Sequence, residues 1–316
     1  MILILTNSAD TTADYLCRCL SREAIEHVRV DTDNLIKRTR LEWSTSKAQI
    51  KLRGKTVDAH EVKDVWLRRP TAPRLPGSDS PAKCHAAYEW AEAIEGFLAH
   101  IPRKRWINHP SANAGASHKL EQLSRAKQFG FCVPRTIVTQ SPKTAKRFWK
   151  EFEGEVVVKP LAAGYIEEVT KREDSLIYTN KIGVDEIRQA ELIRKCPTLF
   201  QEKIQKFSDV RAVYLDGEVI AVELVAQDVD GCQRLDIRRN NMSDVRYRRC
   251  NIPAKMRRQI VALLKSYDLR FGAMDFAIDT QGNWVFFEVN PNGQWAWLDL
   301  EAGTDIAAVF TITFRR

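Results

Sequence analysis

The chain has 316 residues, of which 44% are hydrophobic and 28% charged, and its formal net charge is +8. These proportions are typical of a globular protein, and no apolar run reaches the roughly 18 residues of a membrane span. The basic balance favours an anionic partner such as a nucleotide, a nucleic acid or an acidic peptide. Seven scattered cysteines argue against a zinc site or a disulfide framework, and with no signal peptide they predict a cytoplasmic protein.

The N-terminal third predicts alternating strands and helices. Residues 1–5 and 28–31 are short strand-like runs, and residues 11–26 between them have helical spacing, so together they predict a β-α-β unit. The Pro- and Gly-rich segment 71–81 predicts a loop, and this first region ends near residue 112. Further strands are expected at residues 41–46, 49–53, 55–57 and 65–70, and a helix at residues 82–100.

The rest of the chain mixes helices and strands, so the predicted fold class is α/β (α+β). Helices are expected at residues 117–130, 141–151 and 253–269, and strands at residues 133–138, 156–160, 199–204, 210–215 and 218–226. A last hairpin joins residues 272–278 to residues 284–290 across the turn-forming residues 279–283.

This last hairpin carries three candidate metal ligands. Asp275 lies in its first strand, and Glu288 and Asn290 lie in its second. If residues 280–283 form the connection, Asp275 pairs opposite Glu288, and Asn290 follows on the same face because side chains alternate. Carboxylates in apolar strands are costly unless they are paired or bind a metal. Two carboxylates and an amide oxygen suit Mg²⁺, so the hairpin predicts nucleotide-dependent phosphoryl chemistry.

Other candidates are weaker when taken singly. Lys159 closes a β-branched strand before a small-residue loop ending at Gly164, where it would bind phosphates or, more commonly, be a surface lysine. Asp209 and Arg211 share a strand face and form either a local ion pair or a phosphate-binding site. A linker before them offers backbone groups to an adenine edge and a carboxylate to a ribose: Gln201, Glu202, Lys203 and Ile204.

Two basic segments and two tryptophans leave alternatives open. The segment that contains Asp236, Arg238 and Arg239 and the segment 246–249 predict a basic patch. This patch is either a solvated charged face or a surface that captures an anionic substrate. Trp295 and Trp297 are either core aromatics, the commoner case, or part of an acceptor pocket beside the metal.

In their order along the chain, these motifs resemble the ATP-grasp superfamily. The ordered set is Lys119 before a helix, Lys159, the linker at residues 201–204, Asp209 with Arg211, and Asp275 with Glu288 and Asn290. Within the superfamily the chain looks most like the graspetide synthetases, the microviridin-type macrocyclases of ribosomal peptides. The segments that carry this closer resemblance are 65–70, 236–239, 290–297 and 301–304. The resemblance covers nearly the whole chain.

The resemblance implies an N-terminal pre-ATP-grasp domain at residues 1–112, a central lobe at 113–205 and a C-terminal lobe at 206–316. It implies that ATP phosphorylates an Asp or Glu side chain of a ribosomal precursor peptide, and that a Ser or Thr hydroxyl or a Lys amine displaces the phosphate. A leader segment would dock near the central lobe, and the enzyme would be a homodimer.

The resemblance also implies a role for each site residue. Lys119 and Lys159 would bind ATP phosphates, the linker would hold adenine, with Glu202 and Ile204 flanking the base, and Asp209 would reach the ribose. Arg211 would stabilise the acyl phosphate. Mg²⁺ would bind Asp275, Glu288 and Asn290, and the peptide would bind Asp236, Arg238 and Arg239.

Two segments depart from the family pattern. The tail ends at Arg316, earlier than the last helix of the family leads us to expect, and Asp-Ile-Arg at residues 236–238 replaces an expected Asp-Trp-Arg. The alternative function is an ATP-grasp ligase that joins separate carboxylate and amine substrates, such as a glutamate-tagging or dipeptide ligase. A nucleic-acid-binding protein is a third reading, but no nucleic-acid-binding motif is recognised.

Overall fold

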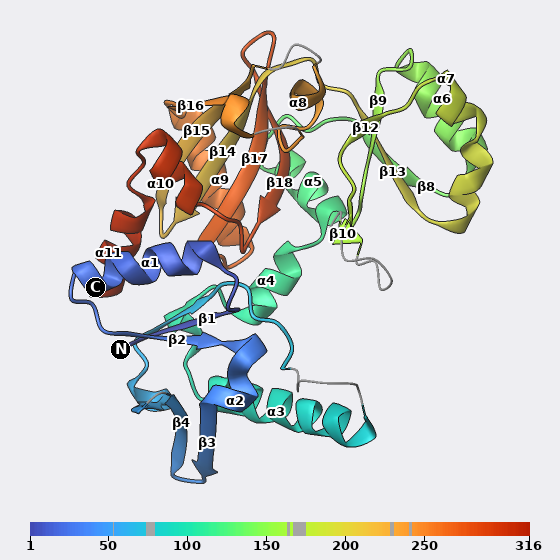
Figure 1. Ribbon diagram of the computed structural model, residues 1–316. Helices are drawn as coiled ribbons and strands as arrows, with labels where there is room; N and C mark the ends of the chain where they lie inside the picture. The colour runs from blue at the N-terminus through green and yellow to red at the C-terminus, as the bar shows by residue number, and fades with distance from the viewer. Residues whose placement is uncertain (53, 74–79, 163–164, 167–174, 228–230, 240–241) are drawn as a thin grey trace.

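The computed structural model describes residues 1–52, 54–73, 80–162, 165–166, 175–227, 231–239 and 242–316 (Figure 1). Its sheets separate along the chain into an N-terminal, a central and a C-terminal group. The element types predicted from the sequence are largely confirmed, including the β-α-β start and the last hairpin. No helix among these residues is long and apolar enough to cross a membrane.

The N-terminal region is built on a parallel four-stranded sheet in the order β2-β1-β6-β7. All five residues of β1 are buried because both faces of this sheet are covered. Helix α1 packs on one face, and α3 and a three-stranded antiparallel sheet, β3-β4-β5, pack on the other. The elements are β1 (Ile2–Thr6), α1 (Thr11–Arg22), β2 (His27–Asp31), α2 (Leu35–Arg38), β3 (Thr39–Ser44), β4 (Lys47–Leu52), β5 (Lys55–Asp58), β6 (Asp64–Leu67), α3 (Pro81–Ala99) and β7 (Trp106–Ile107).

The central region contains a four-stranded antiparallel sheet in the order β12-β9-β13-β8. Its apolar face packs against helices α6 and α7, with Phe148, Val156 and Phe200 buried between them. Because side chains alternate, Lys159 and Gln201 lie on the opposite face. The elements are α4 (Pro110–Ala116), α5 (Lys119–Gln128), β8 (Thr136–Thr139), α6 (Pro142–Glu151), β9 (Val156–Lys159), β10 (Tyr165–Ile166), β11 (Ser175–Leu176), β12 (Asn180–Lys181), α7 (Val184–Arg188) and β13 (Thr198–Glu202).

The C-terminal region contains a five-stranded antiparallel sheet in the order β16-β15-β14-β17-β18. Helices α5 and α9 cover one face, and α10 and α11 pack against part of the other face beside α1 (Figure 1). The first and last helices of the chain are therefore neighbours. The elements are β14 (Lys206–Leu215), β15 (Glu218–Ala226), α8 (Cys232–Leu235), β16 (Val245–Arg249), α9 (Ala254–Ser266), β17 (Phe271–Asp279), β18 (Trp284–Asn290), α10 (Ala296–Ala302) and α11 (Ile306–Arg315).

The structure bears on two of the open interpretations. The basic segment 246–249 forms the edge strand β16, where Arg248 pairs with buried Glu223 and Arg249 pairs with Asp305. Trp295 is fully buried, and its ring stacks on Phe310 with the centroids 5.0 Å apart, so it is a core aromatic. Both arginines of these pairs are more than half exposed, so the segment 246–249 is a charged and solvent-facing edge of the sheet.

Candidate active site

Three charged side chains form a row across the C-terminal sheet. Arg211 on β14 pairs with Asp275 on β17, and Asp275 pairs with Glu288 on β18, so all three point to one face. A guanidinium nitrogen of Arg211 lies 3.2 Å from the Asp275 carboxylate. The predicted pairing of Asp275 with Glu288 is thus confirmed.

The register that produces this row contains an irregularity. Near the hairpin tip, Ile278 pairs with Trp284 and Phe276 with Phe286, and a bulge then shifts the ladder before Asp275 meets Glu288. The turn is one residue shorter than expected, since Asn283 already accepts a hydrogen bond from Asp279. The additional residue in the bulge, Phe287, offsets the shorter turn.

Asn290 completes a group of convergent ligands. Its amide nitrogen lies 3.2 Å from Asp275 Oδ2 and 3.1 Å from Glu288 Oε1. The three predicted metal ligands therefore meet at one point, and a half-turn of the amide directs its oxygen there instead. Among the described residues no group of three or more His, Cys, Asp or Glu side chains gathers in this way, so a bound ion would also need oxygens from a substrate. Two carboxylates suit Mg²⁺, because phosphate oxygens can fill the remaining coordination positions of the ion.

The two carboxylates differ in their electrostatic surroundings. Burial raises the pKa of Asp275, and the nearby Glu288 carboxylate raises it further against the opposing effect of Arg211. Burial also opposes ionisation of Glu288, but Lys119 and the Asn290 amide hold the pKa of Glu288 below its usual value. The pair concentrates negative charge that a divalent cation would neutralise.

Two lysines from outside the C-terminal sheet reach this group. Lys119 Nζ, at the start of α5, lies 3.5 Å from Glu288 Oε2 and donates to the Pro160 carbonyl at 3.0 Å. Lys159 Nζ lies 4.2 Å from the centre of the Phe287 ring, and burial lowers the pKa of Lys159 to about 8. The structure thus places two cations beside the carboxylates, as a phosphate-binding site requires.

The strand that carries Glu288 and Asn290 is held at its outer edge by side chains that the sequence did not single out. Gln122 on α5 donates to the Val289 carbonyl at 2.9 Å and accepts from the Val289 amide at 2.7 Å, so it pairs with this edge as a neighbouring strand would. Asn108 donates to the Pro291 carbonyl, and buried Arg68 donates to the Asn292 carbonyl. The only local sign of this contact in the sequence is that Gln122 follows Lys119 by three residues, and this spacing alone does not identify a structural role.

The predicted adenine linker, residues 201–204, begins in the last two residues of β13 and continues beyond its end. Glu202 accepts from the backbone amide of Arg135 at 2.9 Å, and the Lys203 ammonium lies 2.9 Å from Glu155. These two side chains thus hold the linker against neighbouring segments. Within the described part of the chain no hydrogen bond is made by the backbone amide of Ile204, which leaves it for a ligand.

The other predicted residues lie in tight local pairs. Both oxygens of Asp209 accept from Lys206 at 2.7 Å. The Asp236 carboxylate accepts from the Thr179 amide at 3.0 Å and from the Arg238 guanidinium. Burial opposes ionisation of Asp236, yet these hydrogen bonds hold the pKa of Asp236 below its usual range.

Two arginines of the same segment differ in their surroundings. Arg239 donates to the Thr179 carbonyl at 2.8 Å, so it joins the segment 236–239 to the central region. Arg238 is exposed, and it lies close enough to Asp275 and Glu288 to interact with them electrostatically. Gly164, at the end of the loop considered above as a phosphate loop, falls outside the described residues.

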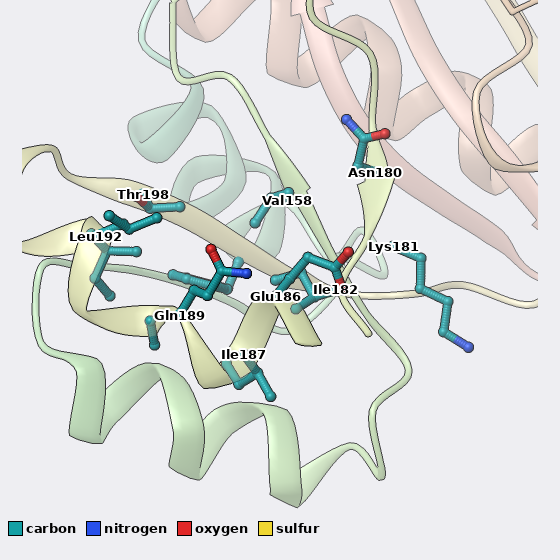
Figure 2. Close-up of a pocket in the computed structure, with 12 residues that line it drawn as sticks. Val158, Asn180, Lys181, Ile182, Glu186, Ile187, Gln189, Leu192 and Thr198 are labelled. Carbon is teal, nitrogen blue, oxygen red and sulfur yellow. The ribbon is translucent and has the colours of Figure 1, made fainter. Parts of the chain in front are cut away.

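A separate cavity of about 420 Å³ lies on the helix side of the central sheet (Figure 2). Val158, Ile187 and Leu192 line it, and Thr198 closes one side. This is the face opposite Lys159 and Gln201, so the cavity is not part of the carboxylate site.

Two mixed lobes, with a carboxylate row on one sheet and lysines that reach it from elements before the second lobe, are the arrangement of the ATP-grasp fold. Comparison with known proteins agrees: residues 1–114 match the family model of the MvdD pre-ATP-grasp domain. The chain thus combines a pre-ATP-grasp domain of the MvdD type with the architecture of the graspetide macrocyclases, as the sequence resemblance implied. A search of curated proteins finds no match.

Solved structures support this assignment along the whole chain. The macrocyclase MdnC bound with precursor peptide MdnA, from Microcystis aeruginosa MRC, has a TM-score of 0.85 and 24% identity, over 99% of this chain and 100% of that one. The macrocyclase MdnB from the same organism has a TM-score of 0.79 and 26% identity, over 99% and 98%. The ATP-grasp ligase PsnB, complexed with a phosphomimetic variant of its minimal precursor, Mg and ADP, has a TM-score of 0.77 and 20% identity, over 99% and 97%.

Proposed function

We propose that this chain is an ATP-dependent peptide macrocyclase. It activates Asp or Glu side-chain carboxylates of a ribosomal precursor peptide as acyl phosphates, which a Ser or Thr hydroxyl attacks to give an ester or a Lys amine attacks to give an amide. The observation that carries the proposal is the convergence of Asp275, Glu288 and Asn290 beside Arg211 and two lysines. Similarity to macrocyclases over the full length supports the choice of a peptide substrate.

Asp275, Glu288 and Asn290 fit Mg²⁺, which would neutralise charge on the nucleotide phosphates when bound. Lys119 and Lys159 bind the phosphate oxygens, and their position at the edge of the carboxylate group directs the nucleotide toward it. Phosphoryl transfer requires mainly positioning and charge stabilisation, and these cations supply both.

Arg211 acts on the acyl phosphate. Its planar guanidinium is fixed beside Asp275, with a nitrogen 3.2 Å from the carboxylate, and its remaining donors are suited to phosphate oxygens. The resulting acyl phosphate has a far better leaving group than a free carboxylate. Acid and nucleophile belong to one peptide, so ring closure gains from their proximity.

Nucleotide and peptide bind on either side of this centre. The Ile204 amide pairs with the adenine edge, and the Asp209 oxygens, which accept from Lys206, keep lone pairs for ribose hydroxyls. Arg238, oriented by Asp236, and Arg239 contact the acidic peptide. From the resemblance we further propose a homodimer that acts in the cytoplasm, and light scattering of the purified protein tests the dimer.

The decisive experiment combines the purified protein with Mg²⁺, ATP and candidate precursor peptides. ADP release that requires a leader-bearing peptide, with loss of one water mass per ring, supports the macrocyclase. ADP release with free amino acids or with separate acid and amine substrates supports the alternative ligase instead. Omission of Mg²⁺ and a peptide with its acids changed to amides serve as controls.

A further inference from the structure

The turn that follows Asn290 is held at three successive carbonyls. The strand ladder ends at the pair of Ala273 with Asn290, and the next residue, Pro291, has no amide hydrogen with which to continue it. The Asn290 carbonyl accepts from the Gly293 amide at 3.0 Å. The Pro291 and Asn292 carbonyls accept from side chains of the N-terminal region. The turn 290–293 is therefore fixed partly from outside its own sheet.

Asn108, directly after β7, supplies the contact to Pro291. Its side chain is buried, and its amide nitrogen donates to the Pro291 carbonyl at 3.1 Å and to the Phe271 carbonyl at 2.9 Å. Its oxygen accepts from the backbone amides of Phe271 at 2.9 Å and Arg270 at 2.8 Å. Backbone amides only donate, so the orientation of the Asn108 amide is settled. Asn108 thus exchanges two hydrogen bonds with Phe271, as a strand neighbour would, and joins the start of β17 to the end of β18.

The turn is also packed closely against β17. A side chain at Gly293 would collide with the Cβ of Ala273, the residue paired with Asn290. Pro291 restricts the preceding Asn290 to extended backbone conformations. The hydrogen bond to Pro291 therefore acts directly on the position of Asn290, whose own amide meets both site carboxylates.

We propose that Asn108 is a positioning residue of the metal centre. By holding the Pro291 carbonyl, it keeps the Asn290 amide in one group with Asp275 and Glu288, where a divalent cation would need its oxygen. Replacing a residue that orients a metal ligand typically lowers metal affinity by about ten- to a hundredfold. The inference rests on the proposed function, and it gives the N-terminal region a part in metal binding although the three proposed ligands all come from the last hairpin.

Isothermal titration calorimetry of the full-length protein with ADP, in Mg²⁺ and in EDTA, tests this role. The quantity of interest is the factor by which Mg²⁺ strengthens ADP binding. Asn108→Ala should reduce this factor about tenfold and leave the metal-free affinity for ADP within about twofold of wild type. A loss of packing alone would weaken both affinities equally. Asn283→Ala, at the exposed far end of the same hairpin, is the matched control and should change neither.

A double-mutant cycle shows whether Asn108 acts through Asn290. Asn290→Ala should itself lower the Mg²⁺ factor, and adding Asn108→Ala should then cause little further reduction. Asn113→Ala is a milder variant that carries the test should Asn108→Ala not fold. It removes the hydrogen bond from Asn113 to the Asn292 side chain at 3.0 Å and should lower the factor about threefold.

Three results overturn the inference alone: an unchanged Mg²⁺ factor in Asn108→Ala or Asn113→Ala, an equal loss of both affinities, and additive losses in the cycle. A wild-type protein whose ADP affinity does not respond to Mg²⁺ overturns the proposed metal site, and the proposed function with it.

Discussion

The face of the C-terminal sheet that bears the acidic pair has two ends of opposite character. At one end, Val213 and Phe271 are buried against Trp66, α10 and α11. A few residues further along the same strands, Arg211 and Asp275 point to the same side, and the neighbouring Glu288 on β18 pairs with Lys119 of α5 and lies near Lys159 of the central lobe. Strand alternation decides only which face a residue occupies. The element packed above that face decides whether it holds a core or a reaction centre.

The largest expected effect comes from the polar end. Asp275→Asn and Glu288→Gln each remove a charge that the metal site requires, so ATP turnover with peptide should fall more than about a thousandfold. The urea midpoint of unfolding should change little, because these side chains are not part of the apolar clusters. Glu218→Gln, an exposed change on β15, is the matched control. Near-normal turnover in either variant would refute the site.

A change at the apolar end should do the reverse. Phe310 is fully buried among aromatic rings, so Phe310→Ala should lower the free energy of unfolding by about 3–4 kcal/mol. Urea unfolding measures this, and ATP affinity at a temperature where the variant remains folded should be within about twofold of wild type. Ile312→Ala, on the same helix but 51% exposed, should cost well under about 1 kcal/mol. Loss of nucleotide binding without loss of stability would contradict the separation of the two ends.

Gln122 tests how the polar end is held at its outer edge. Gln122→Met keeps the volume but leaves the Val289 amide and carbonyl without partners, so we expect about 2 kcal/mol of lost stability and about tenfold weaker Mg-ATP binding. Chemical unfolding and calorimetry measure the two effects. Gln128→Met, exposed on the same helix, should change neither. Unchanged Mg-ATP affinity would show that the edge contact is dispensable for the ligands.

The smallest effect is expected where the two lobes meet. Arg239→Ala removes a contact to the Thr179 carbonyl and should weaken peptide binding about fivefold while ATP affinity changes less than about twofold. Fluorescence anisotropy of a labelled precursor peptide measures the first quantity. Arg234→Ala, an exposed change nearby, should leave peptide binding intact. A larger loss for ATP than for peptide would reassign Arg239 to the nucleotide site.

The sequence predicted the charged residues of the polar end better than the contacts that hold their strand in place. The sequence identified Asp275, Glu288 and Asn290 because polar and charged residues are unusual in apolar strands. The period-two alternation of side chains then placed the three residues on one face. The structure brings together Arg211, Lys119 and Lys159 with them, in agreement with the resemblance. Gln122 was not visible, since a buried glutamine that pairs with a distant strand edge leaves no local pattern.

Other features depended on contacts between distant segments. The segment 246–249 was a run of arginines in the sequence, and only the pairing of β16 with β15 shows it to be an edge strand. Helix α4, beginning at Pro110, was not predicted because its small residues carry no amphipathic pattern. The partners of Asp209 and Asp236 were likewise unknown until the loop and strand geometry was available.

The bulge at Phe287 has a consequence for the comparison of related sequences. Phe287 is the residue without a partner between the pairs Phe276–Phe286 and Asp275–Glu288. Loss of Phe287 alone would therefore place Glu288 directly after Phe286, still opposite Asp275 and on the same face of the sheet. The chain spacing of the acidic pair can thus differ by one residue between related hairpins, and a homologue that lacks only the bulge residue should keep its metal site.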